Sequence, residues 1–133
     1  MKEPFVLVTL RVSYPDKGSD LAAYAHMYIC IENNGIDCCF AKRQSYKPYH
    51  SLPGSKPDKR IVEAPDKSRN PFIHPTLIDL DKLFVIDCRV LNDSVKSRIG
   101  VNDALLSDIT ALIAFTPKIR LSVEGLKLLN PRL

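Results

Sequence analysis

Two histidines, one arginine and one serine stand near the ends of predicted strands, and together they could cleave RNA without a metal ion. The 2′-hydroxyl of RNA is the nucleophile, so a protein need supply only a base, an acid and a cation for the charged phosphorus intermediate. His26 opens one strand pattern, Arg43 and Ser45 follow another, and His74 opens a third. We therefore treat both histidines as acid–base candidates. Arg43 would stabilise the phosphate charge, and Ser45 would orient the reacting groups.

The turn Asn33-Asn34-Gly35 predicts where these side chains meet. Asn-Gly is a strong hairpin signal because both residues tolerate positive φ. The flanking segments Tyr24–Glu32 and Ile36–Ala41 alternate as paired strands do. If they pair around the turn, positions 26 and 42–43 come out at the same edge, which places His26 near Arg43.

Each candidate also has an ordinary structural interpretation. His26 could be a half-buried polar residue on a sheet face, and Arg43 could be a surface cation. Ser45 is of a type common in turns, and His74 could fix a turn by hydrogen bonding. The sequence leaves both interpretations open for every one of them.

Residues 42–70 are rich in proline, serine and basic side chains, and they predict a long basic loop. Only Arg60–Ala64 has strand character in it. A basic loop carrying aromatic residues suits a polyanion with stackable bases. The alternative is a solvated loop whose lysines favour solubility and whose tyrosines pack onto the fold. The predicted RNA contacts are Lys42, Tyr46, Lys47, Tyr49, Lys59 and Arg60.

The elements that must position these residues are mostly strands. Alternating patterns occur besides the hairpin at Phe5–Ser13 and Thr76–Leu80, and Leu83–Ile86 is an apolar run too short for a helix. Lys118–Val123 has a weaker alternation, and the tail at 117–133 has no assigned function. The sequence thus predicts one mostly-β domain over residues 1–133.

One clear helix is predicted, at about residues 102–115. Asn102 or Asp103 can cap its start, and Thr116-Pro117 ends it because the residue before a proline avoids helical space. Its single apolar stripe consists of Leu105, Ile109, Leu112 and Ile113.

Composition excludes some classes of protein. The hydrophobic content of 45% and charged content of 26% are those of a globular chain, and no apolar run approaches the roughly 20 residues of a membrane span. The N-terminal residues do not form a signal-peptide pattern, so we expect a cytoplasmic protein. The net charge of +4 permits an anionic partner without requiring one.

We expect no metal ion or cofactor. Cys38 and Cys39 are adjacent and would face opposite sides of a strand, so they and the two other cysteines are interpreted as buried thiols. A zinc site with His26, His50 or His74 is the alternative. Asp79, Asp81 and Asp87 are close in sequence, but the first two more simply bracket a turn and a strand end. Phosphate-loop, G-x-S-x-G and H-E-x-x-H motifs do not occur.

Residues 76–115 resemble the C-terminal third of the MazF/PemK family of toxin endoribonucleases. The similar segments are DLDKLFVID, the basic KSRIG and VNDALLSDI. The rest of the chain is similar only in the order of its elements. These motifs are structural rather than catalytic, so they bear on fold more than on activity.

The resemblance implies an SH3-like β-barrel, a homodimer, metal-independent cleavage of single-stranded RNA and an antitoxin partner. In that family a basic residue, usually in an Arg-Pro pair, begins the second strand, and a Ser or Thr follows the third. These positions match Ala25-His26 and Gln44-Ser45, so a histidine replaces the arginine and the proline is missing. Two alternatives stay open: a non-catalytic RNA-binding module, and a phage- or plasmid-borne interaction protein that masks a host nucleic-acid site.

Overall fold

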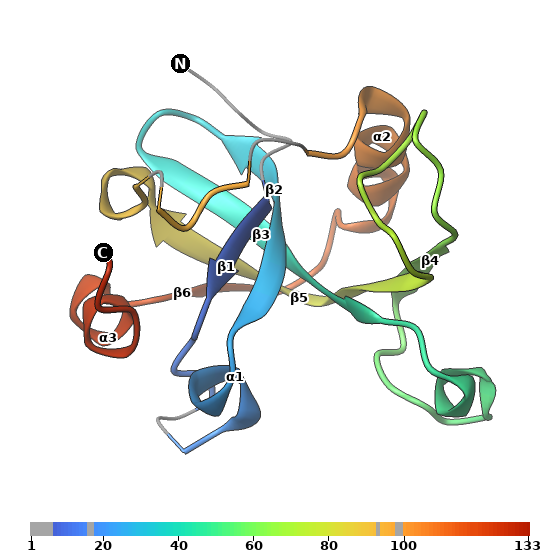
Figure 1. Cartoon of the computed structure of the whole chain (residues 1–133), viewed down its shortest axis with the longest axis horizontal. Helices are drawn as coiled ribbons and strands as arrows, with labels where there is room; N and C mark the ends of the chain where they lie inside the picture. The colour runs from blue at the N-terminus through green and yellow to red at the C-terminus, as the bar shows by residue number, and fades with distance from the viewer. Residues whose placement is uncertain (1–6, 16–17, 93, 98–99) are drawn as a thin grey trace.

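One open β-sheet organises the part of the chain that the computed structural model describes, residues 7–15, 18–92, 94–97 and 100–133 (Figure 1). Its strand order is β1-β2-β3-β5-β4, and β6 pairs with β5 in parallel while the other pairs are antiparallel. The strands of the described residues are β1 (Leu7–Leu10), β2 (His26–Asn33), β3 (Asp37–Ser45), β4 (Arg60–Glu63), β5 (Thr76–Asp87) and β6 (Lys118–Arg120).

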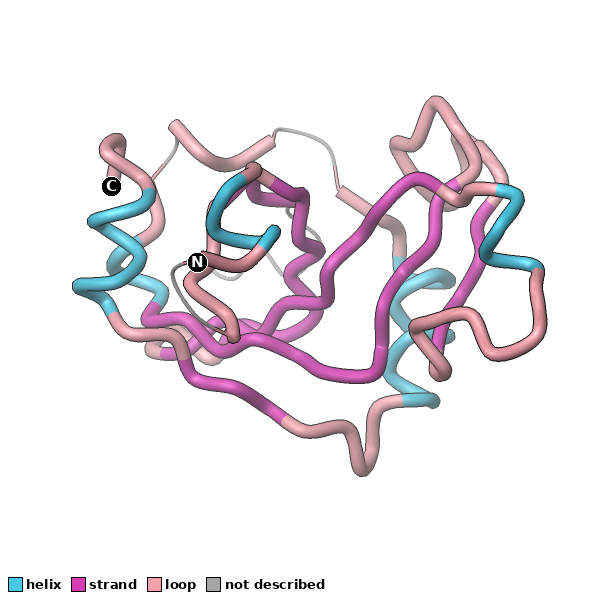
Figure 2. The backbone as a smooth tube through the Cα atoms, turned by 90° about the horizontal axis from the view of Figure 1, so that it is seen from below, coloured by secondary structure: helices cyan, strands magenta, loops and turns pink. Residues whose placement is uncertain are grey.

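Short helices flank the sheet. Figure 2 shows α2 and α3 at opposite ends of the strands. The helical elements are α1 (Asp20–Ala23), η1 (Pro48–Ser51), η2 (Cys88–Val90), α2 (Asp103–Leu112) and α3 (Val123–Leu129). No helix in the described residues is long and apolar enough to cross a membrane.

The sheet buries a core on each face because successive strand residues point to opposite sides. One core contains Tyr28 and Phe40 and is covered by Leu126 of α3. The other contains Ile29 and is covered by Leu105 of α2. This arrangement confirms the mostly-β prediction, whereas the described strands do not close into a barrel.

The β2–β3 hairpin forms where the Asn-Gly pair predicted it, with a different turn geometry. Gly35 has a φ of 91°, and no described non-glycine residue has a positive φ. Asn34 instead accepts hydrogen bonds at Oδ1 from the backbone nitrogens of Ile36 at 2.9 Å and Asp37 at 2.7 Å. The Asn34 side chain thus stabilises the turn, although Asn34 itself does not have a positive φ.

Strand β5 unites the two segments predicted as separate strands. It pairs with β3 on one side, and with β4 and then β6 on the other. Leu80 and Leu83 lie in the same core although they are three residues apart, so the alternation changes phase between them. The register with β3 shifts there as well, between Phe40 and Lys42. This irregularity is what made one strand look like two.

Helix α2 follows its predicted cap more closely than its predicted stripe. Asn102 accepts hydrogen bonds at Oδ1 from the nitrogens of Ala104 at 3.0 Å and Leu105 at 3.2 Å. Leu105 and Ile109 are fully buried. Leu112, however, is 43% exposed as the last helical residue, so its place in the predicted stripe is wrong.

The tail differs most from its prediction. β6 ends at Arg120, and α3 follows although the one clear helix predicted from the sequence lies at about residues 102–115. Ser122 caps α3 by accepting the Gly125 nitrogen at 3.0 Å. A Cβ at Gly125 would lie 2.7 Å from the Ser122 hydroxyl and 3.2 Å from the Ser13 hydroxyl, so this glycine permits close packing rather than breaking the helix.

Three regular elements occupy parts of the predicted basic loop at 42–70. β3 continues to Ser45, and η1 and β4 occupy further parts of it. Asp81 anchors the approach to β4 by accepting the nitrogens of Asp58 at 2.9 Å and Lys59 at 2.7 Å. β4 confirms the strand character predicted at Arg60–Ala64, whereas β3 and η1 occupy parts that were predicted as loop.

Candidate functional site

The β2–β3 ladder separates the two cations at the end of the hairpin. Tyr28 pairs with Lys42, and Met27 pairs with Arg43. Because neighbouring strand residues point to opposite faces, His26 shares a face with Lys42 and not with Arg43. His26 and the two cations lie at the same end of the hairpin, as predicted. The cation on the face of His26 is Lys42, however, so the prediction that Arg43 is its neighbour is wrong.

His26 presents one ring nitrogen as a proton acceptor. Its Nδ1 lies 3.0 Å from the carbonyl oxygen of Tyr24, which can only accept, so Nδ1 carries the proton and Nε2 of the neutral ring does not. Burial lowers the pKa of His26 below its ordinary value of 6.5, and the charge of Lys42 lowers it further against the opposing effects of Tyr24 and Asp20. The ring is therefore neutral near pH 7.

Lys42 is a half-buried amine on the same face. Burial lowers its pKa from the ordinary value of 10.5, the nearby Asp79 carboxylate opposes this, and the charge of Lys82 adds to it. An amine shifted in this direction gives up its proton more readily than an exposed lysine, which suits a proton donor. Asp79 also lies 3.7 Å from the Lys82 amine, so its charge is shared.

An open cavity of about 330 Å³ adjoins Lys42. Asp79 Oδ1 accepts the Asp81 nitrogen at 2.9 Å, and both residues line the cavity. They lie inside β5, so the prediction that they bracket a turn and a strand end is wrong. Asp87 pairs instead with Arg89, and no group of three or more potential ligands in the described residues could hold a metal ion. The lining residues are Lys42, Gln44, Lys56, Pro57, Asp79, Asp81 and Lys82.

Gln44 joins Lys42 to a buried histidine. The Lys47 nitrogen donates to His50 Nδ1 at 2.8 Å, so the ring proton belongs on Nε2, which lies 3.1 Å from the Gln44 amide. The Lys42 amine donates to the Gln44 side-chain oxygen at 2.5 Å, so Gln44 bridges Lys42 and His50.

Arg43 lies on the other face beneath apolar side chains. Its guanidinium carbon is 5.3 Å from the centre of the Phe72 ring, and Nη2 contacts Met27 Sδ at 3.1 Å. Its Nε is buried without a hydrogen-bond partner in the described residues. Burial lowers the pKa of Arg43 below its ordinary value. Ser45 follows two residues later on this same face and pairs with Thr76.

His74 occupies the exposed turn before β5. Its carbonyl oxygen accepts the Thr76 hydroxyl at 2.9 Å, which is the turn-fixing position considered from the sequence. No contact among the described residues joins its imidazole to His26. The structure therefore does not bring the two predicted acid–base residues together.

Three aromatic rings meet around η1. The ring centres of Tyr46 and Tyr49 lie 5.6 Å and 4.4 Å from that of the buried His50. Tyr49 is nevertheless 61% exposed, so one side of its ring can stack on a base. Tyr46 is half-buried and packs onto the fold.

The remaining predicted RNA contacts are Lys47, Lys59 and Arg60. The Lys59 amine contacts the Thr116 hydroxyl at 3.3 Å, and Arg60 Nη1 contacts the Ser55 hydroxyl at 3.2 Å. Lys47 is exposed next to η1. None of these three cations lines the cavity beside Lys42.

Comparison with family models, curated proteins and solved structures gave no match. The resemblance to MazF/PemK toxins thus rests on residues 76–115.

Sequence reasoning missed two residues of the His26 face. The Tyr28 hydroxyl is buried without a hydrogen-bond partner in the described residues, and burial together with Asp79 raises the pKa of Tyr28. The alternation of Tyr24, His26 and Tyr28 could have placed it there. Lys82 had no such signal, because only the folded β5 brings it beside Lys42.

Proposed function

We propose that this chain is a metal-independent endoribonuclease of the toxin type that cleaves single-stranded RNA. One observation carries the proposal: His26, a neutral imidazole, shares one sheet face with Lys42, a half-buried amine that lines an open cavity. These are the base and the cation that RNA transesterification requires. Lys42 takes the role that the sequence suggested for Arg43.

Each group has a defined step. His26 Nε2 accepts the proton of the 2′-hydroxyl as that oxygen attacks phosphorus. Lys42 stabilises the charged intermediate and donates a proton to the departing 5′-oxygen, leaving a 2′,3′-cyclic phosphate. The lowered pKa of Lys42 favours this donation, because a weaker base is the better acid. Water then restores both protonation states.

A contiguous set of contacts could hold the RNA. Tyr49 stacks on His50, His50 contacts Gln44, and Gln44 lines the cavity with Lys42. A base on the exposed Tyr49 ring would place its neighbouring phosphates over Lys42, with Lys47 and Lys56 available as further backbone contacts.

The direct test is incubation of the purified protein with a long single-stranded RNA in EDTA. Discrete fragments ending in 2′,3′-cyclic phosphate are expected. Intact RNA with retarded mobility would support a binder instead, and unbound, uncleaved RNA would contradict both and leave the interaction-protein alternative.

Non-catalytic RNA binding is the second candidate, and a specific observation favours it. Arg43, the predicted stabiliser of phosphate charge, is covered by Phe72 and Met27. Binding through Tyr49 and the lysines would not need it. Retardation without cleavage in EDTA is the outcome that selects this candidate.

The toxin role, the antitoxin partner and the homodimer rest on the MazF/PemK resemblance. Induced expression should arrest growth, and a pull-down from the native host should recover a co-expressed inhibitor. Light scattering on the purified protein reports whether it dimerises.

A further inference from the structure

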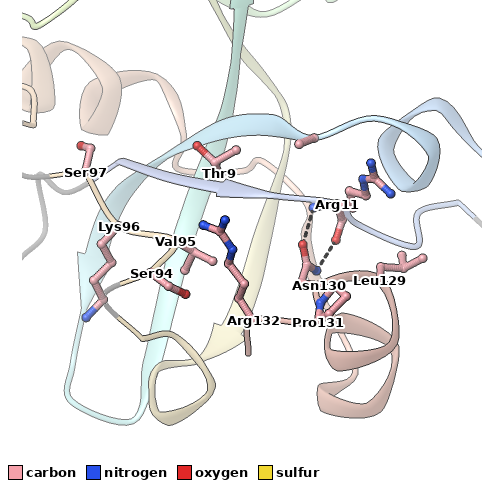
Figure 3. A pocket seen from close by; sticks show the side chains of 11 residues that line it. Thr9, Arg11, Ser94, Val95, Lys96, Ser97, Leu129, Asn130, Pro131 and Arg132 are labelled. Carbon is pink, nitrogen blue, oxygen red and sulfur yellow. Dashed lines mark hydrogen bonds between the residues drawn. The ribbon is translucent and has the colours of Figure 1, made fainter.

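A second, larger cavity lies between β1, residues 94–97 and the C-terminal residues 129–132 (Figure 3). Its volume is about 650 Å³, within the range of about 300–1,000 Å³ that small-ligand sites occupy. The lining residues are Thr9, Arg11, Ala25, Ser94, Val95, Lys96, Ser97, Leu129, Asn130, Pro131 and Arg132. This cavity is separate from the one beside Lys42, since the two have no lining residue in common.

Backbone hydrogen bonds fix its walls. The Thr9 nitrogen donates to the Val95 oxygen at 2.9 Å. Asn130, 9% exposed, accepts the Arg11 nitrogen at Oδ1 and donates to the Arg11 oxygen, both at 2.8 Å. The Asn92 amide donates to the Arg132 oxygen at 2.7 Å. Because these bonds use the main chain of Arg11 and Arg132, replacing those side chains leaves the walls intact.

All charged side chains that line the larger cavity are positive. Arg11, Lys96 and Arg132 are cationic, and none of the lining residues is acidic. None of these three cations forms an ion pair with a described carboxylate. The cavity beside Lys42 differs, because Asp79 and Asp81 lie among its lysines. The larger cavity therefore favours an anion.

The arrangement suits a phosphate group. Figure 3 shows the Arg132 guanidinium pointing toward Thr9, whereas the Lys96 amine and the Arg11 guanidinium lie farther out on either side. A guanidinium binds phosphate through two parallel hydrogen bonds, and the Thr9 hydroxyl can add a third. Val95, together with Leu129 and Pro131, offers apolar surface to the organic part of the ligand.

From this geometry we infer that the cavity binds a phosphorylated nucleotide, either as a free nucleoside phosphate or as the phosphorylated end of an RNA strand. Arg132 is the main phosphate ligand, and Arg11 and Lys96 raise the local positive potential. The inference does not depend on RNA cleavage, because it involves neither His26 nor Lys42.

The test measures binding by calorimetry at low salt with four probes: inorganic phosphate, adenosine 5′-monophosphate, and a short RNA with either a 5′-phosphate or a 5′-hydroxyl. Arg132→Gln should weaken binding of the phosphorylated probes by about 10- to 100-fold, the loss expected for a charged hydrogen-bonded pair. The matched control is Lys127→Gln, the same loss of charge on an exposed position of α3. It should bind as the wild type does.

The probes also distinguish the source of the phosphate. Equal affinity for the monophosphate and the 5′-phosphorylated RNA identifies a free nucleotide, and preference for the RNA identifies a strand end. The inference is overturned if Arg132→Gln and Lys127→Gln bind alike, or if the 5′-hydroxyl RNA binds as well as the phosphorylated one. Arg11→Gln is a second variant that should weaken the same probes, and His26→Gln should leave their binding unchanged even if it abolishes cleavage.

Discussion

His26 and Lys42 share one face of the β2–β3 ladder, whereas Arg43, the next residue, faces the opposite core. A shift of one residue along a strand thus decides which cation meets the imidazole. The consequence is chemical as well as geometric. Lys42 adjoins an open cavity, while the Arg43 guanidinium is covered by Phe72.

His26→Gln should reduce RNA cleavage by about 10²- to 10⁴-fold, the usual contribution of a general base. RNA affinity should stay the same, because the substitution leaves the lysines and Tyr49 in place. Gel-based cleavage and filter-binding measurements on one preparation separate the two effects. The matched variant is His74→Gln, at an exposed histidine that the structure does not bring to Lys42. If His74→Gln lost cleavage and His26→Gln did not, His74 rather than His26 would be the general base.

The cleavage rate should depend on pH in a bell shape. The rate rises as His26 loses its proton, on an acid limb below pH 6.5 because its pKa is lowered from that value. It falls as Lys42 loses its proton, at a pH below 10.5 for the same reason. Single-turnover rates between pH 5 and 10 measure both limbs. An acid limb that persists in His26→Gln would show that another group titrates.

Tyr49→Ala should weaken binding of single-stranded RNA by about 1–3 kcal/mol, the value of one base stacked on an aromatic ring. The ring is exposed, so the fold should be little affected. Phe115→Ala is the control, since that ring is 96% exposed elsewhere on the molecule. Equal losses in the two variants would argue against a stacking role for Tyr49.

Leu105→Ala should lower the free energy of unfolding by about 2–5 kcal/mol, because the side chain is fully buried between α2 and the sheet. Leu112→Ala, at the 43% exposed end of the same helix, should cost much less. Urea denaturation of both variants tests this difference. Similar losses would mean that α2 packs along the whole predicted stripe.

Local signals predicted local structure well. Asn34-Gly35 placed the hairpin, Asn102 placed the start of α2, and alternation assigned Cys38 and Cys39 to opposite cores. Each of these features depends on residues close together in the chain, so composition and spacing carry the information.

The candidate site depends on features that spacing does not carry. Lys42 meets Asp79 because the β3–β5 register shifts after Phe40, and the change of alternation in β5 does not reveal which residues of β3 it pairs with. Helix α3 was not predicted because it contains Gly125, a residue that disfavours helices in general; here the glycine allows close packing against Ser13. The face of each catalytic candidate could have been predicted from strand alternation, whereas hairpin register alone places His26 near both Lys42 and Arg43.

The most direct measurement compares Lys42→Met with Arg43→Met in cleavage of single-stranded RNA in EDTA. Lys42→Met should lose at least about 10²-fold in rate, the scale of one lost charge-stabilising group. Arg43→Met should keep its activity and fold, because it replaces a half-buried guanidinium lacking a described carboxylate partner with an apolar chain of similar length. Full cleavage by Lys42→Met, together with its loss in Arg43→Met, would contradict the assignment of the site to the His26 face.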